Sequence, residues 1–155
     1  MSFAGQAPAN TPGTSGSAGW NPLDTLQLDA LVSACALVAY ADGWVTVEER
    51  KSASARMQRV DATTVFGVER CLMAFDVLIR QFEQDAIAAT ERAEAAILKL
   101  AGKPELGRLV VESACRVAVA DGGLDRAERE AILDICQLLN LDPAPFGVIA
   151  PDGRR

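Results

Sequence analysis

Apolar residues recur along most of the chain at the three- and four-residue spacing of helices that bury one face. The helices that this spacing predicts cover residues 23–41, 46–60, 62–81, 85–100, 104–120 and 125–140. Residues 141–147 contain two prolines and a glycine, and we expect them to close the domain as a short turn or helix. The pattern therefore predicts an all-α fold, a single compact domain of about six to seven helices.

The two ends of the chain have a different composition. Residues 1–21 are rich in Gly, Ala, Ser, Thr and Pro and hold almost no large apolar side chain, so we expect a disordered tail there. Trp20, at the edge of this tail, is predicted to dock on the domain rather than on a partner. The helical domain is expected over residues 22–149, followed by a short tail over 150–155.

One stretch of sequence occurs twice, 79 positions apart. Residues 38–50 and 117–129 share Val, Ala, Ala, Asp, Gly, Glu and Arg at matching places. Each copy reads as an apolar helix that ends at Asp-Gly and is followed by a helix that opens with acidic residues. The duplication predicts two related halves, arranged about an internal pseudo-two-fold axis.

The second helix of each copy begins with a capping box. Thr46-x-x-Glu49 and Asp125-x-x-Glu128 each place an N-cap oxygen three residues before a glutamate. Capping alone accounts for both glutamates and contributes about 1 kcal/mol per helix.

The aspartates of the two Asp-Gly turns are harder to explain. Asp42 and Asp121 follow the carboxyl ends of helices, where the helix dipole disfavours negative charge by roughly 0.3–1 kcal/mol. A positive charge nearby would compensate each of them. It comes either from Arg50 and Arg129, folding back as salt bridges, or from a divalent cation.

A hard divalent cation binds carboxylate, carbonyl and water oxygens. If the halves pack about a two-fold axis, the acids of both turns share one region and repel one another unless a cation is bound. The candidate metal ligands are Asp42, Glu49, Asp121, Asp125 and Glu128. Their spacing is not that of an EF-hand, which requires a glutamate at loop position 12.

Composition excludes several functions. The net charge of −6 weighs against nucleic acid, and the longest apolar run, over residues 30–41, is too short for direct membrane insertion. There is no histidine, no nucleotide-binding glycine motif and no nucleophile beside a base. The cysteines are scattered among apolar neighbours, which favours buried thiols in a reducing cytoplasm; they are Cys35, Cys71, Cys115 and Cys136. A carboxylate-only, metal-assisted hydrolase is the remaining enzymatic alternative.

The two Ala-Asp-Gly turns and the Glu-Arg pair after each resemble the tellurite resistance protein TerB family. The closing Leu141-Asp142-Pro143-x-x-Phe146-Gly147 strengthens the resemblance, which extends over about residues 31–148. It implies an all-helical protein of the cytoplasm without enzymatic activity, linked to resistance to tellurite and related stresses.

The resemblance also implies partners and a cofactor. Family members form complexes with other tellurite-resistance proteins, including a membrane protein, so the chain is expected in the cytoplasm or peripheral to the inner membrane through that partner. The acids at the paired turns, here Asp42, Glu49, Asp121 and Glu128, match a site proposed for a divalent metal cation (Ca, Mg, Mn or Zn). The alternative is a metal-independent interaction scaffold in which these acids only cap helices and pair with arginine.

Overall fold

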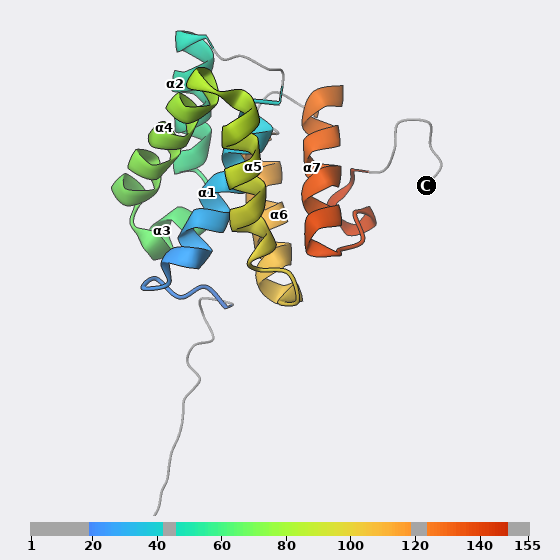
Figure 1. The fold of residues 1–155 in the computed structure, drawn as a ribbon. Coiled ribbons are helices and arrows are strands. Elements are labelled where there is room, and N and C mark those ends of the chain that lie inside the picture. Colours follow the sequence, from blue (N-terminus) through green and yellow to red (C-terminus); the bar gives the residue numbers. More distant parts are fainter. Residues whose placement is uncertain (1–18, 42–45, 119–123, 149–155) are drawn as a thin grey trace, which may run out of the picture.

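The computed structural model describes residues 19–41, 46–118 and 124–148. These residues form helices joined by short connections, without strands, and confirm the all-α prediction (Figure 1). The α-helices are α1 (Thr25–Ala39), α2 (Val47–Gln58), α3 (Ala62–Phe66), α4 (Val68–Gln84), α5 (Ala86–Leu98), α6 (Pro104–Ala118) and α7 (Arg126–Leu139). A 3-10 turn, η4 (Ala144–Phe146), follows α7, as the proline-rich closing segment predicts.

The helix predicted over residues 62–81 is wrong as a single element. It is divided into α3 and α4 by Gly67, whose backbone angles are φ 98° and ψ 120°. This conformation is far from helical and is open to glycine because glycine has no Cβ. The apolar spacing continues across the break, since both segments pack on the same core.

Several other helices begin one or two residues later than predicted, because their first residues are caps. The Asp24 side chain accepts hydrogen bonds from the backbone of Leu26, at 2.9 Å, and of Gln27, at 3.3 Å. Asp85 caps α5 in the same way, with a hydrogen bond of 3.1 Å from the backbone N–H of Ala88. Short polar side chains of this kind favour the N-cap position over the helix interior.

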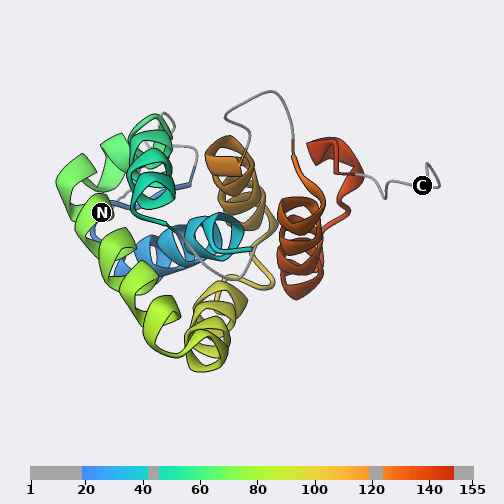
Figure 2. The ribbon, with the colours of Figure 1, turned by 90° about the horizontal axis from the view of Figure 1, so that it is seen from above.

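α1 is the central helix of the fold. Ten of its fifteen residues are buried, and it packs against α4, α5, α6 and α7 (Figures 1 and 2). The helices around it are amphipathic and bury one face each. On α4 the buried face consists of Cys71, Phe75, Ile79 and Phe82, which recur at three- and four-residue intervals as the sequence predicts.

Two aromatic contacts fix the direction of α1 relative to α4. Before α1, Trp20 packs edge-on against Phe66, with ring centroids 5.4 Å apart. At the carboxyl end of α1, Tyr40 lies 5.1 Å from Phe82, near the end of α4. The two helices therefore run in the same direction. Trp20 is only 7% exposed, which confirms that it docks on the domain.

Candidate functional site

The repeated segments flank two turns at one end of the molecule. α1 and α6 pack side by side, and both point their carboxyl ends toward the top of Figure 1. α2 and α7 begin at that same end and run back down, and Figure 2 looks onto it from above. α7 packs against α1, and α2 packs against α6, so each repeat contacts the other. The topology thus brings the helix ends around both Asp-Gly turns to one side of the fold.

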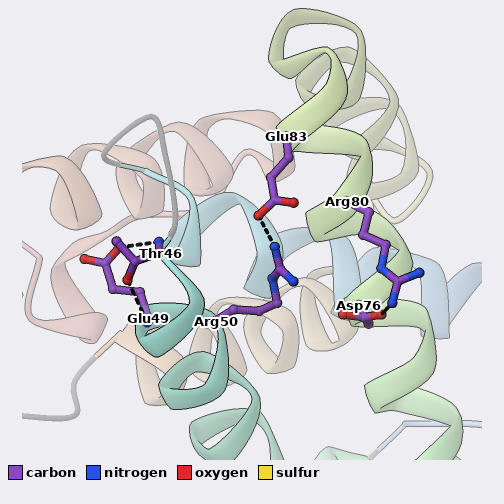
Figure 3. A network of polar contacts seen from close by, with 6 residues as sticks. All are labelled: Thr46, Glu49, Arg50, Asp76, Arg80 and Glu83. Atoms are coloured by element: carbon purple, nitrogen blue, oxygen red, sulfur yellow. Dashed lines mark hydrogen bonds and ion pairs between the residues drawn. The ribbon is translucent and has the colours of Figure 1, made fainter.

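Both predicted capping boxes are present. At the start of α2, Thr46 Oγ1 accepts from the backbone N–H of Glu49 at 3.0 Å, and Glu49 Oε1 accepts from the N–H of Thr46 at 2.9 Å (Figure 3). At the start of α7, Asp125 Oδ1 accepts from the N–H of Glu128 at 2.7 Å, and Glu128 Oε1 accepts from the N–H of Asp125 at 3.1 Å. Each glutamate therefore turns back toward the loop that precedes its helix.

The capping role can be measured separately from any ligand. We expect Asp125→Ala to lower the free energy of unfolding by about 1 kcal/mol, because an N-cap acceptor and its dipole-compensating charge are lost. Urea denaturation with excess chelator measures this cost, and Asp125→Ser, which keeps a capping oxygen, is the matched control. Equal losses for alanine and serine would contradict the capping role.

The two repeated arginines have different contacts. Arg50 forms a salt bridge with Glu83 and so ties α2 to α4, on which it packs (Figure 3). Arg129 instead donates from Nη2 to the backbone carbonyl of Leu124, at 3.3 Å, in the connection before its own helix. Because the side chains of Arg50 and Glu83 are each about a third exposed, their ion pair adds little stability and mainly fixes geometry.

The salt-bridge partner of Arg50, Glu83, was not predicted from the sequence. It lies 33 residues from Arg50, and no local pattern links the two positions. A second pair beside it on α4, between Arg80 and Asp76 at 2.9 Å, follows the ordinary one-turn spacing (Figure 3). Arg50 Nε is buried and has no hydrogen-bond partner among the residues that the structure describes.

The candidate metal ligands divide into two groups. Asp42 and Asp121 lie outside the described residues. Glu49, Asp125 and Glu128 are described, and each contributes one carboxylate oxygen to a capping bond. Within ranges 19–41, 46–118 and 124–148, no three His, Cys, Asp or Glu side chains gather closely enough to hold a metal ion. The three described acids therefore do not form a metal centre by themselves.

The cysteines are free thiols packed in the core. Burial raises the pKa of Cys71, Cys115 and Cys136 to about 11, and it raises the pKa of Cys35 further. Since the thiolate is the form that attacks electrophiles and binds metals, these residues are poor nucleophiles and poor ligands. The observed burial agrees with the packing role predicted for them.

In the part of the chain that the structure describes, no helix is long and apolar enough to cross a membrane.

No curated protein and no solved structure matches the chain. The model of the family described as tellurite resistance protein TerB matches residues 28–150, which include all seven α-helices except the first residues of α1. This range contains both Asp-Gly turns, both capping boxes and the closing 3-10 turn. The chain therefore belongs to the tellurite resistance protein TerB family.

Proposed function

We propose that the protein is a non-enzymatic, divalent-cation-binding and protein-interaction module of a tellurite- and stress-resistance system. Its membership of the TerB family supports the assignment to tellurite resistance. We place it in the cytoplasm, or at the inner membrane through a partner, where it binds other proteins of the same system. The proposed cation ligands are Asp42, Glu49, Asp121, Asp125 and Glu128.

The observation that carries the cation site is the shared placement of the repeated helix ends. α1 and α6 end, and α2 and α7 begin, at one end of the fold (Figure 1). α1 packs on α7 and α6 packs on α2, so the first helix of each repeat contacts the second helix of the other. This reciprocal packing is expected of two related halves and supports the proposed pseudo-two-fold axis. Under this proposal, acids contributed by both turns share one region of the surface.

The charges around the turns also favour a cation. Arg50 directs its guanidinium to Glu83, so its positive charge is shared with α4. Each capping bond of Glu49 and Asp125 uses one carboxylate oxygen, whereas an ionised carboxylate offers about four acceptor sites. Capping therefore orients these groups without exhausting their capacity to bind a hard cation such as Ca²⁺, Mg²⁺ or Mn²⁺, or the softer Zn²⁺.

The second candidate is a metal-independent interaction scaffold. It is favoured by the capping bonds, which already give Glu49, Asp125 and Glu128 a structural role. In this case the family fold serves only to present helix surfaces to partners.

Thermal unfolding with and without cation distinguishes the two. A ligand at 100 times its dissociation constant stabilises the native state by about 2.7 kcal/mol, which raises Tm by roughly 5–10 °C for a chain of this size. We expect this rise in the wild type and not in the variant Asp42→Asn/Asp121→Asn. Asp76→Asn, the same change in the middle of α4, where the half-exposed Asp76 pairs with Arg80, should keep it.

An unchanged Tm in millimolar Ca²⁺, Mg²⁺, Mn²⁺ and Zn²⁺ would favour the scaffold. So would a rise in Tm that the double variant shares, because the cation would then bind elsewhere.

A further inference from the structure

A groove of about 360 Å³ opens between α4 and α5, and its described lining includes no residue of the repeated turns. α1 forms its floor, and Figure 1 shows α1 (blue) between the two helices. The apolar part of its lining consists of Val32, Ala74, Val77, Leu78 and Ala96. A pocket of this volume is within the range that binds ligands and partner side chains.

Four polar residues complete the lining; Asp29 and Arg92 are exposed, Gln81 is half-buried and Ser33 is buried. Asp29 and Ser33 come from α1, Gln81 from α4 and Arg92 from α5. Among the described residues, none of these four side chains has a hydrogen-bond or ion-pair partner. Ser33 is only 3% exposed, but its Oγ is not among the fully enclosed polar atoms that lack a partner, so water in the groove reaches it. A ligand that fills the groove would displace this water and needs a polar group to replace it.

One end of the groove lies near the connection between α4 and α5. These two helices meet at Asp85, which ends α4 and caps α5, so they run in opposite directions. Gln81 is in the last turn of α4, and Arg92 is about two turns into α5. Both therefore line the part of the groove nearer the connection.

Asp29, the acidic residue of the lining, lies toward the other end of the groove, away from the connection between α4 and α5. The contact between Tyr40 and Phe82 places the carboxyl end of α1 beside the end of α4. Ser33 is one turn closer to this end than Asp29, so Asp29 lies away from the connection. The groove therefore carries negative charge at the end away from the α4–α5 connection and positive charge nearer that connection.

The apolar surface continues beyond the groove. Val77 at its edge is 53% exposed, and Met73, one turn earlier on the same face of α4, is 70% exposed. A small molecule held in the groove would leave Met73 in water. A helical segment lying along α4 would cover both residues, and such segments bind grooves through side chains at i, i+3 and i+4.

We propose that this groove binds an amphipathic helix of a protein partner. The helix inserts a bulky aliphatic side chain between α4 and α5, sets a basic residue against Asp29, and sets an acidic residue further along the same face against Arg92. Ser33 and Gln81 supply hydrogen bonds at the end near Arg92. The inference rests on the interaction part of the proposed function, at a surface that includes no residue of the repeated turns.

The probe is a capped, alanine-based helical peptide of about 16 residues. It carries a lysine, a leucine and a glutamate at positions i, i+3 and i+7, so that all three side chains lie on one face. Titration into the ¹⁵N-labelled full chain, with chelator present, should shift the amide signals of Ser33, Val77 and Arg92. Because chelator removes any bound cation, failure of the metal site leaves this result unchanged.

Charge reversal tests the assigned contacts. Arg92→Glu should weaken peptide binding about tenfold, because like charges then face each other. A peptide with lysine in place of its glutamate should restore the affinity toward that variant. Arg108→Glu, the same change at an exposed position of α6, should leave the affinity unchanged.

Three results would overturn the proposal. The first is the absence of shifts in the groove at millimolar peptide. The second is that free leucine shifts the same amides as strongly as the peptide, which would assign the groove to a small zwitterion. The third is that these amides shift with protein concentration alone, which would assign it to a second copy of the chain.

Discussion

Replacing Phe75 by alanine is expected to lower the free energy of unfolding by about 3–5 kcal/mol. Phe75 is the largest of the side chains that are fully buried in the described core, and it belongs to the buried face of α4. Its removal loses apolar burial and leaves a cavity that the packed helices around α1 can only partly close. Because small domains are stable by about 5–15 kcal/mol, this single change should remove a large part of the stability.

Urea denaturation followed by circular dichroism measures the effect. Met73→Ala is the matched control, since Met73 is on the same helix but 70% exposed and should cost no more than about 0.5 kcal/mol. Similar losses for the two variants would contradict the packing of α4 described above.

The second large effect is on thiol reactivity. With a pKa of about 11, Cys71, Cys115 and Cys136 hold several hundred times less thiolate near neutral pH than a free cysteine, whose pKa is about 8.5. We expect the native protein to react with a disulfide reagent at least about a hundredfold more slowly than the urea-unfolded chain. Stopped-flow absorbance at about pH 8 measures both rates.

The same shift predicts how stability depends on pH. Burial favours the protonated thiol, so the folded state binds the proton more tightly than the unfolded state. The stabilisation is therefore complete below about pH 8.5 and is lost as the pH rises toward the folded-state pKa near 11.

Fast labelling of any one cysteine in the native protein would contradict the predicted low thiol reactivity. Cys115, which is the least buried of the four, is the most sensitive test.

The sequence predicted the helices well because each buries a continuous apolar face. It missed the break at Gly67 because both α3 and α4 bury residues on the same core, so the apolar spacing does not stop there. Glycine inside such a pattern has two outcomes, a tolerated helical residue or a positive φ, and the sequence does not distinguish them. Trp20 was placed correctly because a large aromatic beside a polar tail gains more by packing than by exposure.

The local part of the candidate site was also predictable. A capping box joins residues only three positions apart, so Thr46 with Glu49 and Asp125 with Glu128 could be identified from spacing alone. The salt bridge of Arg50 with Glu83 could not, because it depends on how α2 packs against α4.

The groove was missed for the same reason as the salt bridge. Its polar residues come from three helices that meet only in the folded state. In the sequence, Asp29 and Arg92 look like ordinary members of solvated helix faces. The absence of a partner for Ser33 within the described part of the fold becomes visible only once α1 is surrounded by α4 and α5.

Titration calorimetry of the two turns tests the central claim most directly. If the acids of both turns share one cation, the wild type should bind one cation per chain, and either Asp42→Asn or Asp121→Asn alone should abolish the heat of binding. Two independent sites, each surviving substitution of the other turn, would contradict a shared site. The absence of binding heat with every one of Ca²⁺, Mg²⁺, Mn²⁺ and Zn²⁺ would contradict the cation account altogether.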